Sequence, residues 1–175
     1  MKHHDAQLFS KKLFQSLAVF GTATICLTLQ AQAGSAVTAV PAAIQQQLLQ
    51  SADPRLAANK KLVFDFWREV IEAGQLDKAY QYLSPDYIQH NPNIADGSKA
   101  FVAFFAGFTK QNPVQPQIRQ PLVNIIAEGP YVTLVFVQTL ADKSRPGSTY
   151  TTTAFDMFRI ADGKIAEHWD GMRKQ

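Results

Sequence analysis

Apolar residues recur at helical spacing in the middle of the chain. The apolar positions follow i, i+1, i+4, i+5, i+8 and i+9, which places one stripe on a helix face: Leu62, Val63, Phe66, Trp67, Val70 and Ile71. Asp53 and Pro54 form a helix start, with an N-cap residue followed by proline at the first helical position. Gly74 marks its end. The pattern predicts one helix between Pro54 and Gly74, with Trp67 packed in the core.

Two shorter helices are predicted after Gly74. Leu76 to Leu83 places its apolar residues on one side, and Ser84-Pro85 interrupts it. Lys99 to Lys110 carries a row of phenylalanines, and Asn112-Pro113 stops it. Between them, Tyr87 to Pro92 (YIQHNP) is too short and too broken by proline to predict a long element. A further short helix is predicted at 42–49.

The residues after Pro116 are typical of strands separated by turns. Gln117–Ala127 and Tyr131–Leu140 are separated by a Glu-Gly-Pro turn, and the loop SRPGS follows. Thr149 to Met172 then forms a hairpin around Ala161-Asp162-Gly163. Three helices followed by four strands predict an α+β fold, with the helices packed on one antiparallel sheet.

The first 33 residues have the features of a secretory signal peptide. Three lysines precede a mostly apolar run from Leu13 to Leu29, and Ala31-Gln32-Ala33 is an A-x-A cleavage site. The apolar run is short and too polar for a membrane anchor. Cys26, the only cysteine, lies within the run. We therefore predict cleavage after Ala33 and a periplasmic or secreted protein, with no stable membrane span after cleavage.

Charge changes the picture only after this segment is removed. The full chain has 17 basic and 14 acidic residues, and the predicted signal peptide contains three of the former and one of the latter. The remaining chain is nearly neutral, without the basic stripe that nucleic-acid binding requires. We predict a flexible lead-in at 34–52 and one domain at 53–175.

The closing hairpin carries the candidate chemistry. Strand side chains alternate between faces, so Asp156 shares a face with Phe158, and His168 shares a face with Asp170. With a three-residue turn, Ile160 would pair with Lys164, and Asp156 would lie opposite His168. Two carboxylates and an imidazole on one apolar face predict a site.

Acid/base chemistry is the function that this group of side chains favours. Burial, and a second carboxylate nearby, raise the pKa of a carboxyl group, so that it can remove a proton next to a carbonyl. We expect Asp170 to be the acid/base, with Asp156 and His90 assisting. A hydrogen-bond donor would stabilise the enolate oxygen. His168, Tyr87, Phe158 and Trp67 are the predicted substrate-binding residues.

Structural interpretations of the same residues stay open. Asp170 is also suited to capping the strand end or pairing with Arg173, and Asp156 and His168 to forming a structural pair. His168 would face solvent if the outer side of the sheet were the one it occupies. Trp169 points to the opposite face, where packing or a dimer contact is expected.

Other chemistries find little support in the sequence. Histidine and carboxylate residues can hold zinc or iron, but no tight ligand spacing such as H-x-x-x-H is present. The sequence also contains no glycine-rich phosphate loop and no G-x-S-x-G motif. We predict no metal and no cofactor.

The N-terminal helix, the segment YIQHNP and the closing FDMFRIADGKIAEHWD together resemble the SnoaL-like polyketide cyclase family, of the nuclear-transport-factor-2-like superfamily. The resemblance covers about residues 56–172 and implies a cone-shaped α+β fold. It also implies aldol chemistry without metal or cofactor, with an aspartate at the position of Asp170 as acid/base and with His90 as the loop histidine. Asp156 departs from the family, where a histidine is expected, and so does the signal peptide.

Two functions follow as hypotheses. The first is an exported, cofactor-free enzyme of the cyclase, lyase or isomerase type, which acts on a small hydrophobic carbonyl compound. The second is a non-catalytic module of the same fold that binds a small ligand or mediates dimerisation. The resemblance implies a homodimer through the sheet.

Overall fold

A computed structural model of the chain describes residues 37–174. By its internal contacts the chain divides into two units, Met1–Ala33 and Gly34–Gln175, and the described residues belong to the second. The predicted signal peptide, residues 1–33, lies outside the described residues. No helix within residues 37–174 is long and apolar enough to cross a membrane.

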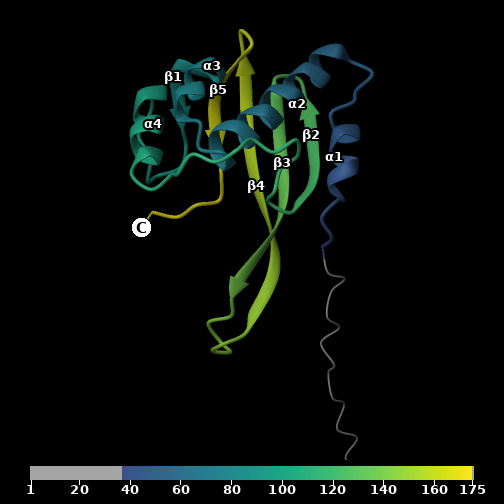
Figure 1. The fold of residues 1–175 in the computed structure, drawn as a ribbon, viewed down its shortest axis with the longest axis vertical. Coiled ribbons are helices and arrows are strands. Elements are labelled where there is room, and N and C mark those ends of the chain that lie inside the picture. The colour runs from purple at the N-terminus through teal and green to yellow at the C-terminus, as the bar shows by residue number, and fades with distance from the viewer. Residues whose placement is uncertain (1–36, 175) are drawn as a thin grey trace, which may run out of the picture. The chain divides into compact units, whose positions relative to one another are not determined.

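The described unit combines six helical segments with one five-stranded sheet, and the predicted α+β fold is confirmed, although one strand, β1, precedes the last helix, α4 (Figure 1). The helical segments are α1 (Ala42–Leu48), α2 (Pro54–Phe66), η1 (Trp67–Glu72), η2 (Leu76–Lys78), α3 (Ala79–Tyr82) and α4 (Ser98–Ala106). The strands are β1 (Leu83–Gln89), β2 (Leu122–Glu128), β3 (Tyr131–Ala141), β4 (Thr149–Ala161) and β5 (Lys164–Trp169).

The predicted long helix is confirmed as α2 and its π-helical continuation η1. The Asp53 side chain accepts a hydrogen bond from the Arg55 backbone N–H at 2.8 Å, which caps the first turn. Gly74 ends the helix with φ +68°. A Cβ at this position would lie 2.5 Å from the carbonyl oxygen of Lys110, so the site excludes larger residues.

The segment around Pro85 is the main correction to the predicted fold. The second predicted helix is confirmed as η2 and α3, which end at Tyr82, but the chain then continues as strand β1, where no long element was predicted. The strand order β1-β5-β4-β3-β2 puts β1 at an edge, pairing parallel with β5, with an irregular register between Leu83 and Ile88. An edge strand tolerates proline because one side of its backbone needs no partner.

Two other element boundaries differ from the prediction. Helix α4 ends at Ala106 rather than Lys110. The strand predicted from Gln117 begins only at Leu122, because Pro121 immediately precedes the paired residues. The strand predictions at 131–140 and in the closing hairpin are confirmed.

The closing hairpin has a different register from the one predicted. Ala161 pairs with Lys164, so the turn contains only Asp162 and Gly163, both at positive φ. Ile160 then pairs with Ile165, but Arg159 pairs with Glu167, which leaves Ala166 as a bulge. His168 therefore lies opposite Phe158 rather than Asp156, and Lys164 does not share its face.

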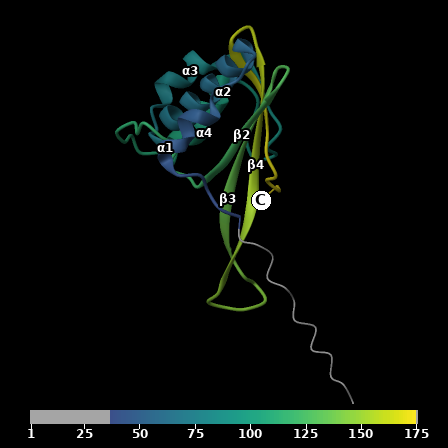
Figure 2. The same ribbon diagram turned by 90° about the vertical axis from the view of Figure 1, so that its right-hand side faces the viewer.

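Helices α2, α3 and α4 cover one face of the sheet, as Figure 2 shows from the side. The inward residues of β3 are fully buried, at Val132, Leu134 and Phe136, and the aromatic rings of Phe66 and Trp67 pack onto Phe158 from the helix side. We call this the inner face of the sheet. The opposite, outer face exposes large apolar side chains, including Ile126, Tyr131 and Phe155.

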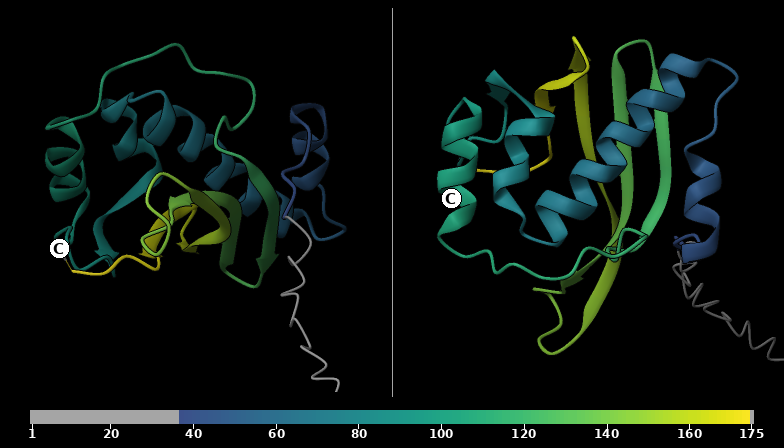
Figure 3. Two further views of the ribbon diagram at one scale, coloured as in Figure 1. Left: turned by 90° about the horizontal axis from the view of Figure 1, so that it is seen from below. Right: turned by 45° about the horizontal axis from the view of Figure 1, so that its top comes forward.

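Helix α1 lies beside β2 at the edge of the sheet (Figure 3). The Gln45 side chain is 3% exposed and exchanges two hydrogen bonds with the backbone of Ile118. The short helix predicted in the lead-in is confirmed, and this buried amide holds it against the domain.

Strands β3 and β4 continue beyond the rest of the sheet (Figure 1). The pairing of β2 with β3 begins at Phe136, and that of β5 with β4 ends at Met157. Beyond Val137 and Thr153, the two strands pair only with each other within residues 37–174, as a projecting hairpin. In this described part of the chain, the β4 edge therefore has no neighbouring strand where β5 ends.

Candidate active site

A cavity of about 240 Å³ lies between the inner face and the helices. One part of its wall is apolar and the other polar. The apolar wall includes Phe66, Trp67, Phe101, Phe104, Phe105 and Phe158. The polar wall consists of Tyr87, Gln89, Asn91, Asn93, Asp156, His168 and Asp170. Six of the seven predicted site residues line this one cavity, and only His90 does not.

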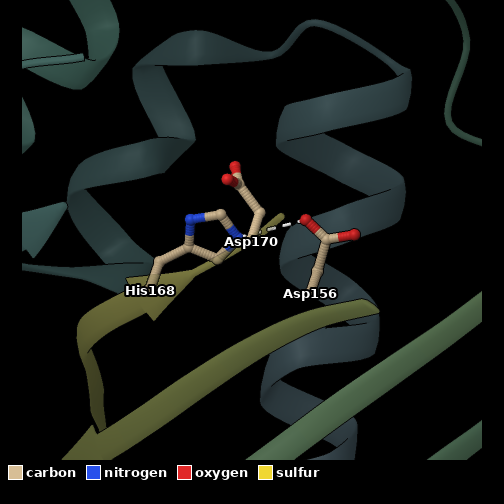
Figure 4. A group of neighbouring side chains, drawn as sticks. All are labelled: Asp156, His168 and Asp170. Atoms are coloured by element: carbon tan, nitrogen blue, oxygen red, sulfur yellow. Dashed lines mark hydrogen bonds and ion pairs between the residues drawn. The ribbon is translucent and has the colours of Figure 1, made fainter. Parts of the chain in front are cut away.

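Asp156 and His168 form a hydrogen-bonded pair at the polar wall (Figure 4). Nε2 of His168 lies 3.1 Å from Oδ1 of Asp156, and the imidazole ring packs against Phe158 at 4.7 Å between centroids. His168 is 8% exposed. The alternative in which it faces solvent is therefore wrong, and the pair lies in a largely desolvated place.

Gln89 determines which nitrogen of His168 carries a proton. Its Oε1 accepts from the backbone N–H of Asn91 at 3.0 Å, and its Nε2 donates to Tyr87 Oη, which fixes the orientation of the amide. Nδ1 of His168 lies 2.9 Å from the same Oε1 and must be the donor. The contact between His168 Nε2 and Asp156 Oδ1 is a hydrogen bond only if one of these two atoms carries a second proton. That proton lies either on the imidazole or on the carboxyl group, so the two residues share it.

Asp170 follows β5 and is held by two other donors. Asn91 Nδ2 donates to one carboxylate oxygen at 2.8 Å, and the Met172 backbone N–H donates to the other at 2.9 Å. The second contact caps the strand end, as one structural alternative required. No ion pair joins Asp170 to Arg173 in the described part of the chain. The two donors hold the Asp170 carboxyl group at the cavity wall.

Tyr87 is buried beneath these acids, with 1% of its surface exposed. Burial, followed by the negative charges of Asp170, Asp156 and Asp96, raises the pKa of the Tyr87 hydroxyl above its usual range. The hydroxyl accepts from Gln89 and keeps its own proton at any physiological pH. It is therefore a permanent donor at the polar wall.

The prediction that His90 joins this site requires correction. Its ring lies on the outer face, stacked on Trp169 at 4.6 Å, with Nε2 3.1 Å from a carboxylate oxygen of Glu167. The hydrogen bond from His90, and next the pairing with Arg159, lower the pKa of Glu167. Because β1 alternates sides, Gln89 points to the cavity and His90 points away from it.

Gln89 and Asn91 are the site residues that sequence reasoning missed. The signal was present in YIQHN, since Tyr87, Gln89 and Asn91 alternate along the segment. Treating it as a strand would have placed these three on one side and His90 on the other. Strand β1 was not predicted because it contains Pro85, and proline is depleted in sheets.

Asp156, His168 and Asp170 are also the residues that could hold a metal ion. One ligand atom from each lies within 4.8 Å of the others. Nε2 of His168 and Oδ1 of Asp156 already share a proton, which a metal would have to displace. The absence of a metal stays a prediction.

Comparison with known proteins gives a family and several similar folds. No curated protein sequence matches the chain significantly. A SnoaL-like polyketide cyclase from Jannaschia sp. CCS1 shares 22% identity, with TM-score 0.47 over 70% of this chain and 91% of that one. An NTF2-like protein of unknown function from Burkholderia pseudomallei shares 16%, with TM-score 0.47 over 66% and 91%. An LEH-like epoxide hydrolase of Mycobacterium tuberculosis shares 14%, with TM-score 0.45 over 65% and 80%.

The family is shown by the sequence itself. The SnoaL-like domain pattern matches residues 63–168, which is more than half of the chain. This range contains α2 from Val63 on, the four helical segments that follow α2, and all of β1 to β4, and it ends at His168 in β5. The resemblance predicted over residues 56–172 is thereby confirmed, and the chain belongs to the SnoaL-like domain family.

Proposed function

We propose that the protein is a cofactor-free acid/base enzyme that acts on a small apolar carbonyl compound, by aldol cyclisation or a related lyase or isomerase reaction. The observation that carries the proposal is the polar wall itself. The Asp170 carboxylate, the hydrogen-bonded pair of Asp156 and His168, and the Tyr87 hydroxyl all border one mainly apolar cavity. Such groups are what proton transfer next to a carbonyl needs.

Asp170 is the proposed base. Its oxygens accept from Asn91 and from the Met172 backbone N–H, which hold the carboxylate in place while lone pairs remain for a substrate C–H. The proton leaves the carbon next to the carbonyl and binds Asp170, and the electron pair moves to the carbonyl oxygen. In an aldol step the enolate carbon then attacks a second carbonyl, and Asp170 returns its proton to the new alkoxide.

The developing oxygen charge needs donors that are present before the reaction begins. Tyr87 and the proton shared by Asp156 and His168 are the proposed donors. Tyr87 replaces His90 in this role, because His90 lies on the outer face. Gln89 contacts both Tyr87 and His168, and so positions the two donors together.

Exchange of ketone protons in D₂O tests this proposal without knowledge of the natural substrate. Phenyl isopentyl ketone carries exchangeable protons beside its carbonyl, and NMR measures their loss. Asp170→Asn is expected to slow catalysed exchange by about 100-fold or more, as removal of a general base does. Asp77→Asn, at an exposed helical position, is the control. Full activity in Asp170→Asn would refute the assignment of the base.

A binding module without catalysis is the second candidate. It is favoured by the closed hydrogen-bond network, in which Asp156, His168, Gln89 and Tyr87 satisfy one another without a ligand. Retention of an apolar ligand through purification, with no proton exchange by the unmodified protein, would favour this candidate over the enzyme.

We also propose that two copies associate through the outer face. Tyr131, Ile126 and Phe155 expose 42%, 52% and 54% of their surface there, which is unusual for large apolar side chains. Phe155→Glu is expected to convert a dimer to a monomer in sedimentation experiments. A monomer in the unmodified protein would contradict the proposal.

Export to the periplasm or the medium is proposed from residues 1–33. The support is the lysine, apolar and A-x-A pattern of the sequence. Cell fractionation and N-terminal sequencing test it, with a mature chain beginning at Gly34 as the expected result. A cytoplasmic protein that retains Met1 or Lys2 would contradict it.

A further inference from the structure

A second hollow adjoins the cavity at its two acids. It has a volume of about 530 Å³ and lies beyond the end of β5, where the β4 edge has no neighbouring strand. Asp156, Asp170 and Met172 line both spaces. The Asp156 and Asp170 carboxylates therefore lie where the two spaces meet, which we call the junction, with the aromatic cavity on one side and the second hollow on the other.

The second hollow offers hydrogen-bonding groups that the protein leaves unused. Its wall includes the aromatic residues Phe155 and Trp169 as well as Gln120, Gln138 and Thr153. The side chains of these three polar residues have no hydrogen-bond partner among residues 37–174. Each has uncharged groups that can donate and accept. The cavity differs in this respect, because its Gln89 and Asn91 amides are already engaged.

Charge limits what the two spaces can accept. Among residues 37–174, no lysine or arginine lines either space, and the only charged residue types along their walls are Asp156, Asp170 and His168. The Asp156–His168 pair shares a proton, so the charge left at the junction is that of Asp170. An anion next to it would be repelled in a partly desolvated place.

We propose that the ligand has two parts, with an apolar group in the aromatic cavity and an uncharged hydrogen-bonding arm, such as an amide or a hydroxyl, in the second hollow. The proposal rests on the proposed function for the position of the carbonyl, which lies at the junction beside Asp170. A carboxylate or phosphate arm is rejected. The substrate class is thus a neutral aryl or alkyl ketone with a polar, uncharged tail.

Three ketones with the same phenyl group and arms of nearly equal size test this inference by calorimetric binding. They are β-benzoylpropionamide, β-benzoylpropionate and phenyl isopentyl ketone. We expect the amide to bind about threefold to tenfold more tightly than the isopentyl ketone, which is the range of one neutral hydrogen bond. We expect the carboxylate to bind at least about tenfold more weakly than the amide, because of the charge on Asp170.

Variants locate the preference in the second hollow. The double substitution Gln138→Leu/Gln120→Leu is expected to reduce the advantage of the amide to below about twofold, because it removes the side-chain amides that can bond the arm, while the isopentyl ketone keeps its affinity. Gln111→Leu, an exposed glutamine outside both spaces, is the matched control. Both substituted positions retain accessible surface, and circular dichroism verifies that the variants fold.

The inference would be overturned by equal affinities for the three ketones, by tightest binding of the carboxylate, or by an amide preference that survives both substitutions. Absence of binding by all three would overturn it as well. Proton exchange of the isopentyl ketone is measured separately. Exchange without an arm preference contradicts only the two-part ligand, and an arm preference without exchange contradicts only the enzyme.

Discussion

Two histidine–carboxylate pairs lie on opposite faces of the sheet, in the region formed by β4, β5 and the end of β1. On the inner face His168 contacts Asp156, and on the outer face His90 contacts Glu167. The distances are the same, at 3.1 Å, but the surroundings differ. His168 borders an apolar cavity and is locked by Gln89, whereas His90 has a side chain 39% exposed and its Glu167 partner is also bound by Arg159. Residue type and pairing distance alone therefore do not distinguish a reactive pair from a structural one.

The largest contrast is expected between two phenylalanines of β4. Phe158 faces the core and is 1% exposed, while Phe155 is on the outer face. Phe158→Ala should lower the free energy of unfolding by about 3–5 kcal/mol, because it leaves a cavity under Trp67 and His168. Phe155→Ala should change the free energy of unfolding of the monomer, at protein concentrations too low for the proposed dimer, by less than about 0.5 kcal/mol. Urea denaturation of the two variants measures both, and similar losses would remove the distinction between the faces.

Substitution of the two histidines compares the pairs directly. His168→Ala should slow proton exchange by about 100-fold, since it removes a proposed proton donor. His90→Ala should leave exchange within about twofold, as expected for a group that does not touch substrate. The ratio of rates in D₂O is the measurement. A larger effect at His90 would contradict its position outside the site and support the sequence-based prediction that His90 assists Asp170.

Gln89→Leu tests whether the inner pair depends on its neighbour. The substitution leaves Nδ1–H of His168 without its acceptor, which should destabilise the fold by about 1–3 kcal/mol. Nitrogen NMR should show the proton on Nδ1 in the unmodified protein and a mixed population in the variant. Gln81→Leu, on the exposed side of α3, is the control. An unchanged NMR spectrum would show that Gln89 does not set the tautomer.

The outer pair should have a small effect that depends on pH. The pKa of Glu167 is lowered by its hydrogen bond with His90 and by Arg159, so its contribution to stability is present above the pKa of an unfolded glutamate. It is lost as the pH falls through the lowered value. Glu167→Gln should therefore cost about 0.5–1 kcal/mol near neutral pH and nothing in strong acid. Urea denaturation at several pH values tests this, and a constant difference would contradict it.

Much of the fold could be predicted because its local signals agree with its tertiary structure. The stripe of α2, the cap at Asp53 and the Asp-Gly turn of the hairpin each have one interpretation. Strand β1 could not be predicted, because Pro85 is acceptable only at the sheet edge, and the edge position depends on pairing with β5.

The site could be predicted in part for the same reason. Asp156, His168 and Asp170 belong to one hairpin, and the alternation of side chains along its strands predicts that they share a face, although the predicted pairing register was wrong. His90, Gln89 and Asn91 belong to β1 and the loop after it. Their sides depend on a strand pairing with residues about 80 positions later, which no local pattern reveals.

The bulge at Ala166 determines how β5 tolerates change along its length. Ile165 and His168 both face inward although three positions separate them, and Ala166 and Glu167 lie between. A substitution scan would therefore show sensitive positions spaced by three and then by two, at 165, 168 and 170. A regular strand shows one spacing throughout. Related sequences should show the same change of spacing between their least variable positions. The bulge can therefore be preserved in evolution even where the alanine itself is replaced.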